Sequence, residues 1–230
     1  LFSALPLSAC AAGETALPLS AGLEALQGQF VKGVGPETNG YTLDYRYYSP
    51  VENGKSGKYP LVIWLHGMSE GAYEGKQVIN NNIAYWTSAE FQARFAPEGG
   101  AYILAPRSLE EKMIFWDDSM VEPLRATIDD FIAKNRDTID VTRIYIGGFS
   151  MGGKMTLKMS AAYPEMFAAA FPICPAWNID EENAANLHGL PIWLTSGVLD
   201  PLVNYYTSVT PTWKKIIAQS DDPAACRFST

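Results

Sequence analysis

Hydrophobic residues recur along this chain in short continuous runs separated by amphipathic stretches. The runs at 60–65 and 143–146 show no alternation, which is typical of parallel strands covered on both faces. Further strands are predicted at 29–34, 41–48, 101–105, 168–173 and 191–194. Strand and helix signals alternate after residue 25, and this order favours an α/β fold with a mostly parallel sheet flanked by helices on both faces.

Four helices are predicted between these strands. One begins at the capping box of residues 87–90, and another covers 121–132, where apolar residues at helical spacing form a stripe that packs on the core. A third runs from Met151 to Tyr163, where Pro164 ends it. The last opens at Thr210-Pro211.

The composition supports one domain with a sizeable core and excludes one class of partner. Of the 230 residues, 47% are hydrophobic and only 18% are charged, a balance that suits a folded chain. The net charge of −8 repels polyphosphates, so nucleic acid is not expected as a partner. We divide the chain into a signal remnant and linker at 1–25 and one folded domain at 26–230, which we expect to be incomplete at its C-terminus.

The first residues are typical of an exported protein. The apolar stretch from Leu1 is too short to span a bilayer, and it is similar to the end of an export signal. Leu7-Ser8-Ala9-Cys10 resembles a bacterial lipobox, in which Cys10 would carry the lipid. We therefore expect a secreted protein or a membrane-anchored lipoprotein of the bacterial cell envelope. The alternative is an apolar segment that packs on the domain.

Two further cysteines, Cys174 and Cys226, could form a disulfide in an exported protein. Cys174 is expected at the carboxyl end of one strand and Cys226 near the opposite end of another. Because a disulfide needs closely spaced Cβ atoms, two separate buried thiols are the favoured interpretation.

The strongest chemical signal is Gly148-Phe149-Ser150-Met151-Gly152, which matches G-x-S-x-G. It follows a predicted buried strand and precedes a predicted helix, as a nucleophile elbow requires. The glycines remove side chains where the turn brings backbone close, and the helix N-terminus favours developing negative charge. Ser150 is therefore the predicted nucleophile. The alternative is a glycine-rich turn with an incidental serine.

A second signal, Leu65-His66-Gly67-Met68, ends an earlier buried strand. Acyl transfer places negative charge on a carbonyl oxygen, which backbone N–H groups must stabilise. The residue after the nucleophile, Met151, and the loop after this strand, at Met68, are the predicted donors. His66 sits at a strand end before Ser150, so we interpret it as support for the loop rather than as the general base.

A third signal supplies the acid. Asp200 lies on the loop after the predicted strand at 191–194, and it follows Ser150 in the chain order expected of such an enzyme. It would orient a histidine and stabilise its charged form. The chain holds two histidines, and His188 precedes the strand that delivers Asp200, so it belongs at the wrong end of the sheet. The catalytic histidine is expected beyond Thr230.

The run 139–153, with residues 41–46 and the His66-Gly67 loop, resembles a branch of the α/β-hydrolases. That branch holds polyhydroxybutyrate-depolymerase-like esterases, feruloyl and acetylxylan esterases and "predicted peptidases". The resemblance covers roughly residues 29–230 and implies an α/β-hydrolase fold and a serine carboxylic-ester hydrolase, often exported and often acting on plant cell-wall esters. Met68 departs from the small residue common after the His-Gly pair, which leaves the acyl pocket undefined.

Two loops should shape the substrate site, because ligands bind at the carboxyl ends of strands in open α/β sheets. One contains Trp116 and the other Trp177, and their rings could stack on a phenolic acyl group or a sugar. His66 is grouped with them as a residue of the substrate site. The aromatics could equally pin the loops.

No metal-ligand cluster, P-loop or dinucleotide fingerprint occurs, so no cofactor is predicted. The expected substrate is a small-molecule or polysaccharide-linked ester. Two alternatives stay open: a serine peptidase of the same fold, and a non-catalytic surface lipoprotein that binds a glycan or a partner.

Overall fold

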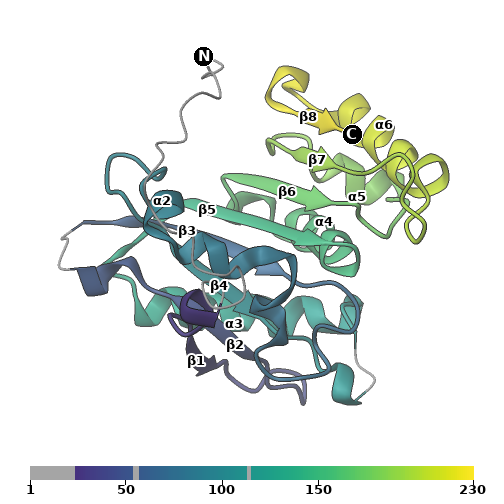
Figure 1. Ribbon diagram of the computed structural model, residues 1–230. Coiled ribbons are helices and arrows are strands. Elements are labelled where there is room, and N and C mark those ends of the chain that lie inside the picture. The colour runs from purple at the N-terminus through teal and green to yellow at the C-terminus, as the bar shows by residue number, and fades with distance from the viewer. Residues whose placement is uncertain (1–23, 54–56, 113–114) are drawn as a thin grey trace, which may run out of the picture.

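In the computed structural model, which describes residues 24–53, 57–112 and 115–230, eight strands form one sheet (Figure 1). Their order is β1-β2-β4-β3-β5-β6-β7-β8. The pairs β1–β2 and β2–β4 are antiparallel, and the other neighbours are parallel. The strands are β1 Val31–Val34, β2 Asp44–Tyr48, β3 Tyr59–Leu65, β4 Tyr102–Pro106, β5 Ile139–Phe149, β6 Ala169–Ile173, β7 Trp193–Thr195 and β8 Arg227–Ser229.

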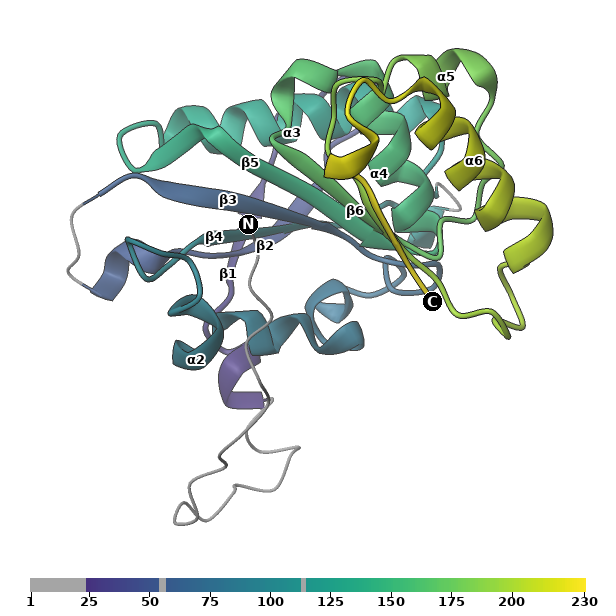
Figure 2. The same ribbon diagram turned by 90° about the horizontal axis from the view of Figure 1, so that it is seen from above.

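Helices cover the two faces of this sheet unequally. Figure 2 shows α3, α4, α5 and α6 on one face and α2 on the other. The helices are α2 Ala89–Gln92, α3 Val121–Lys134, α4 Met151–Ala162, α5 Glu181–Ala185 and α6 Thr210–Gln219. Short 3₁₀ helices lie at Pro50–Asn53, Lys76–Val78, Asn80–Thr87, Glu110–Lys112, Asp118–Met120, Pro164–Met166 and Pro223–Ala225, and a π-helical turn spans Tyr205–Val209. The predicted α/β fold is confirmed.

Strand β3 explains why its sequence lacks alternation. All seven of its residues are buried. Leu61 and Ile63 belong to the larger core cluster, which also contains the apolar stripe of α3, whereas Val62 and Trp64 pack in a second cluster on the other face. Because both faces of the strand are covered, polar residues have no place along it.

Local details differ from the sequence predictions. The N-cap of α2 is Ser88, whose hydroxyl accepts the N–H of Phe91 at 3.2 Å, while the Thr87 hydroxyl donates to the carbonyl of Ala84 at 2.9 Å. The predicted capping box therefore starts one residue too early. The 3₁₀ segments at Lys76–Val78 and Asn80–Thr87 and the helix α5 have no counterpart in the predictions, because short helices lack a periodic apolar stripe.

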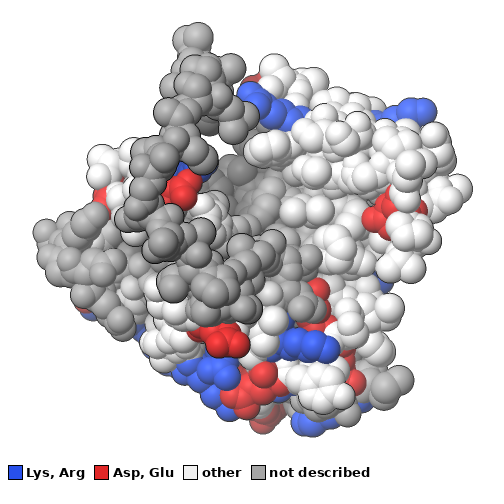
Figure 3. Space-filling model, in the orientation of Figure 1, with Lys and Arg blue, Asp and Glu red and all other residues white. Residues whose placement is uncertain are grey.

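The face of β6, β7 and β8 opposite α4–α6 is apolar. Figure 3 shows few charged side chains over these strands, and a hollow of about 600 Å³ there is lined by Ala169, Phe171 and Trp193 among others. Cys10 and the predicted signal segment lie outside the described residues. Within the described residues, no helix has both the length and the apolar character to cross a membrane.

Candidate active site

Ser150 occupies a sharp turn between β5 and α4. Its backbone has φ 58° and ψ −112°, a conformation that non-glycine residues adopt rarely and mainly at functional turns. Its N–H donates to the carbonyl of Ile173 on β6 at 2.9 Å, and its carbonyl accepts the N–H of Ala176 at 3.1 Å. The hydroxyl does not cap α4. The turn therefore presents a half-buried hydroxyl at the carboxyl edge of the sheet.

The two glycines of the motif are required by close backbone approach. A Cβ on Gly152 would lie 2.0 Å from the carbonyl oxygen of Leu65, and one on Gly148 would lie 2.6 Å from the same atom. Real Cβ atoms do not come this close, so a side chain at either position would push α4 away from β3. The G-x-S-x-G pattern thus reflects the packing that forms the turn.

Asp200 lies on the loop after β7. Its Oδ1 accepts the N–H groups of Leu202 and Val203, both at 2.9 Å, and the thiol of Cys174 donates to the carboxylate. The hydrogen bond from Val203, together with those from Leu202 and Cys174, lowers the pKa of Asp200 despite some desolvation. The side chain is therefore held as a carboxylate.

Cys174 connects this carboxylate to the elbow. Cys174 directly follows β6, and its N–H donates to the carbonyl of Thr195 at 2.7 Å. The carbonyl of the preceding residue, Ile173, accepts the N–H of Ser150. The backbone of Cys174 has φ 36°, in the left-handed region. Burial, with the nearby Asp200 charge, raises the pKa of its thiol to about 11, so the thiol stays protonated and can donate. Cys174 and Cys226 are both buried and free, as the favoured interpretation predicted.

The two predicted oxyanion donors lie on neighbouring strands. Leu65 at the end of β3 pairs with Gly148 near the end of β5, so the loop with Met68 and the start of α4 leave the sheet side by side. Met151 is the first residue of α4, and its N–H has no carbonyl partner one turn earlier in the helix. Met68 is 61% exposed, so its side chain extends from the rim of the site rather than into the core.

His66 is fully buried, and both of its ring nitrogens are engaged. Nδ1 lies 2.7 Å from the carbonyl oxygen of Gly67, and Nε2 accepts the N–H of Ser108 at 3.0 Å. Burial lowers the pKa of this histidine to about 4, which keeps the ring neutral. His66 therefore holds its loop and has no surface on which to contact a substrate, which corrects its grouping with the substrate-site residues.

Trp116 is corrected for the same reason. Its side chain is 1% exposed, and its indole N–H donates to the carbonyl of His66 at 3.1 Å. Trp177 differs, because it is half-buried beside Ala176, the residue that contacts the Ser150 carbonyl. The Lys158 ammonium lies 4.6 Å from the Trp177 ring centroid. Trp177 therefore remains the aromatic candidate for substrate contact.

Neither histidine of the chain reaches the elbow as a base. His66 is buried with its ring nitrogens occupied, as described above. His188 is exposed, hydrogen-bonds Asp221 and precedes β7, whereas Asp200 follows the other end of that strand. Among the described residues, therefore, no histidine is placed to take a proton from Ser150 while it contacts Asp200.

The sequence did not reveal the polar residues beneath the loop 66–71, which carries the predicted oxyanion donor Met68. Arg107 and Asp44 form a bidentate ion pair at 2.7 and 2.6 Å, and Arg107 also donates to the carbonyl of Gly71 at 2.8 Å. Ser108 and Glu110 are buried beside them. The only signal was a polar stretch directly after a buried strand, because pairs more than 30 residues apart leave no local pattern.

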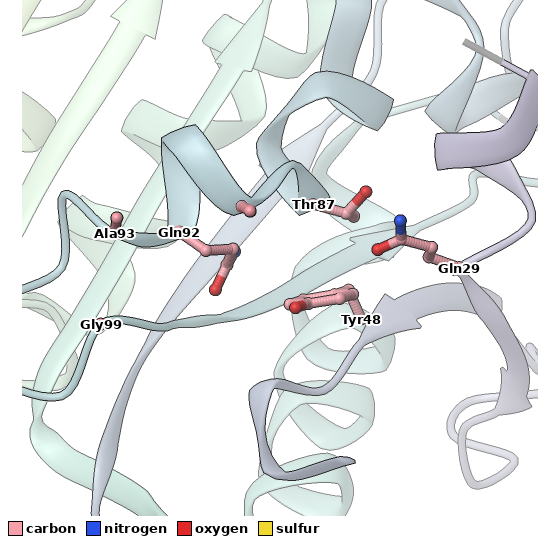
Figure 4. Close-up of a pocket in the computed structure, with 7 residues that line it drawn as sticks. Gln29, Tyr48, Thr87, Gln92, Ala93 and Gly99 are labelled. Carbon is pink, nitrogen blue, oxygen red and sulfur yellow. The ribbon is translucent and has the colours of Figure 1, made fainter. Parts of the chain in front are cut away.

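The pocket in Figure 4 is not part of this site. It has a volume of about 510 Å³, and Gln29, Tyr48, Thr87 and Gln92 are among the residues that line it. Gly99, also in its wall, precedes β4, whereas Ser150 follows the carboxyl end of the parallel strand β5. The pocket therefore lies at the opposite end of the sheet. Within the described part of the chain, no group of three or more potential metal ligands occurs.

Comparison with known proteins agrees with this geometry. The chain is 30% identical over 180 residues to a poly(3-hydroxybutyrate) depolymerase of Ralstonia pickettii, covering 70% of this chain and 35% of the relative. It is 28% identical over 130 residues to poly(3-hydroxyalkanoate) depolymerase C of Paucimonas lemoignei, covering 55% and 30%. The chain thus spans about a third of the length of these curated relatives.

Solved structures show the same fold. A thermostable esterase superposes with a TM-score of 0.75 at 26% identity, covering 90% of this chain and 56% of the other. Est1E from Butyrivibrio proteoclasticus gives a TM-score of 0.58 at 18% identity, covering 86% and 88%, which supports the fold alone. A family model described as phospholipase/carboxylesterase matches residues 47–219. The chain belongs to this phospholipase/carboxylesterase family of α/β-hydrolases.

Proposed function

We propose that this chain is the catalytic part of a carboxylic-ester hydrolase that works through a Ser-His-Asp acyl-enzyme mechanism. The observation that carries the proposal is the geometry of Ser150, whose backbone has φ 58° and whose hydroxyl is not used to cap the helix that follows. A serine in so constrained a turn at the carboxyl edge of the sheet is suited to nucleophilic attack.

In the first half of the reaction, the Ser150 oxygen attacks the ester carbonyl and the carbonyl oxygen becomes negatively charged. The N–H groups of Met151 and Met68 are the proposed donors to that oxygen. Collapse of the tetrahedral intermediate expels the alcohol and leaves the acyl group on Ser150. Water then attacks the acyl-enzyme and releases the acid.

Proton transfer in both halves needs a base. Asp200, held ionised by its backbone hydrogen bonds, is the proposed partner of a histidine that accepts the Ser150 proton and delivers it to the leaving alcohol. Since His66 and His188 lie elsewhere, we propose that this histidine comes from outside the 230 residues.

The proposed substrate is an ester linked to a polymer. The relatives named as polyhydroxyalkanoate depolymerases support a polyester. The resemblance described above supports feruloyl or acetyl esters of plant polysaccharides. Met68, Leu199 and Leu202 are exposed apolar side chains on the two loops that border the site, and they suit an apolar acyl group or polymer surface.

The test uses the natural full-length protein with short p-nitrophenyl esters, a polyhydroxybutyrate film, feruloylated arabinoxylan and peptide p-nitroanilides. We expect ester hydrolysis and labelling by a fluorophosphonate, both abolished in Ser150→Ala. Cleavage of the anilides without the esters would favour the peptidase. Labelling that persists in Ser150→Ala would refute the assigned nucleophile, and no turnover or labelling at all would favour a non-catalytic binding protein.

We also propose that the protein is exported and anchored to the cell envelope through a lipid on Cys10, on the basis of the Leu7–Cys10 pattern alone. Metabolic labelling with a fatty acid in a bacterial host should modify the natural protein and not Cys10→Ser. Equal labelling of both would refute this assignment.

A further inference from the structure

The loop from His66 to Gly71 must be held from beneath if the Met68 N–H is to point at a substrate oxygen. The Met68 side chain is 61% exposed, so burial of this side chain does not fix the loop. Ser69 has φ 71°, in the left-handed region that disfavours a residue with a Cβ. A loop with such a residue relaxes unless neighbouring contacts maintain its shape.

Those contacts come from the segment that follows β4. The N–H of Ser108 donates to His66 Nε2 at 3.0 Å, before Met68, and Arg107 Nη1 donates to the carbonyl of Gly71 at 2.8 Å, after it. Both ends of the loop are thus fixed to consecutive residues of another strand end. What remains is the middle of the loop, next to Met68 itself.

Glu110 occupies that position. Its side chain is 7% exposed, and the backbone N–H groups of Ser69 and Gly71 donate to its carboxylate, as does the hydroxyl of Ser108 at 3.5 Å. The approach is close, since a Cβ on Gly71 would lie 3.1 Å from the Glu110 carboxyl carbon. Gly71 is therefore held on both sides, its N–H by Glu110 and its carbonyl by Arg107.

We propose that Glu110 is a positioning residue of the active site, which holds the Ser69 and Gly71 amides so that the intervening loop presents the Met68 N–H to the ester oxyanion. Its catalytic meaning rests on the proposed function, whereas its effect on the loop does not. A carboxylate suits the task because it offers two acceptor oxygens to two donors. Glutamine has the same shape but one acceptor oxygen, and its NH₂ group would face an N–H.

The first measurement needs no variant. In the natural full-length protein, residue-resolved amide exchange by NMR should show Ser69 and Gly71 protected by about 100-fold or more relative to an unstructured chain. Exchange of both amides at unstructured rates would overturn the proposal, whatever the protein's activity.

The second measurement uses Glu110→Gln with Glu122→Gln as its control, since Glu122 is exposed and hydrogen-bonds only the surface residue Asn39 among the described side chains. In Glu110→Gln we expect faster exchange at Ser69 and Gly71. For p-nitrophenyl acetate, kcat should fall about 10-fold or more with KM within about twofold, because the lost contact serves the transition state. Unchanged exchange, or a raised KM with unchanged kcat, would overturn the proposal.

A third variant separates positioning from general damage to the fold. Glycine adopts φ 71° without the cost that serine carries. Ser69→Gly in the Glu110→Gln background should therefore restore part of kcat, and no recovery in a folded double variant would count against the proposal. If the natural protein shows no esterase activity, the proposed function fails, while the exchange measurements still decide whether Glu110 holds the loop.

Discussion

The thiol of Cys174 donates a hydrogen bond to the carboxylate of Asp200, so the residue that follows β6 directly contacts the proposed acid of the site. The carbonyl of Ile173, the residue directly before Cys174, accepts the N–H of Ser150. Cys174 thus lies between the nucleophile's backbone and the acid, a link between two loops that are 50 residues apart in the chain (200 − 150).

This contact predicts an effect of Cys174 on catalysis. Cys174→Ala removes a donor to a charged group, an interaction worth roughly 1.5–3 kcal/mol. In the natural full-length protein we expect kcat/KM for a p-nitrophenyl ester to fall about tenfold. Cys174→Ser keeps a donor of similar size and should retain most of the activity. Equal losses in the two variants would indicate a packing role instead.

The state of the same thiol can be tested directly. Because burial raises its pKa to about 11, little thiolate exists at pH 8, and the side chain is also 3% exposed. Iodoacetamide at pH 8 should leave Cys174 unmodified in the folded protein and modify it after urea unfolding. Mass spectrometry of the peptide that contains Cys174 would show this, and rapid modification of the native protein would contradict the buried position.

Gly152 should tolerate no side chain. Gly152→Ala places a Cβ 2.0 Å from the Leu65 carbonyl oxygen, and that atom belongs to backbone that cannot rotate away. We expect a loss of about 2–3 kcal/mol in the free energy of unfolding and a fall in kcat of about 100-fold, as α4 and Ser150 shift together. Gly189→Ala is the matched control, since a Cβ there meets nothing within 4 Å. Similar urea midpoints for the two variants would refute the packing argument.

The parts of this molecule that sequence patterns predict are those with a local cause. Strand β3 is identified because every residue in it is buried, and the elbow at Ser150 because its glycines stand at fixed offsets. Trp116 was misjudged because sequence does not reveal whether a loop aromatic faces inward, where this one donates to His66. Glu110 was missed because the two backbone amides that donate to its carboxylate, those of Ser69 and Gly71, lie about 40 residues earlier in the chain.

His66 leads to a prediction about acid stability. Its pKa is about 4 in the folded protein and about 6.5 in an unfolded chain. Between pH 4 and pH 6.5, therefore, the unfolded state binds a proton on this ring and the folded state does not. The free energy of unfolding should therefore fall as pH drops from about 6.5 toward 4, by on the order of 3 kcal/mol, and this contribution should stay constant above that window.

Urea unfolding at several pH values measures this loss. His66→Gln loses the ring hydrogen bonds, so it should be less stable than the natural chain near neutral pH. Because glutamine cannot be protonated, the variant should also lose less stability on acidification. His188→Gln is the matched control, since His188 is exposed and its only described side-chain partner is Asp221. A pH dependence that persists unchanged in His66→Gln would mean that the folded state protonates this ring as readily as the unfolded state does, which would contradict a ring kept neutral with Nε2 accepting the Ser108 N–H.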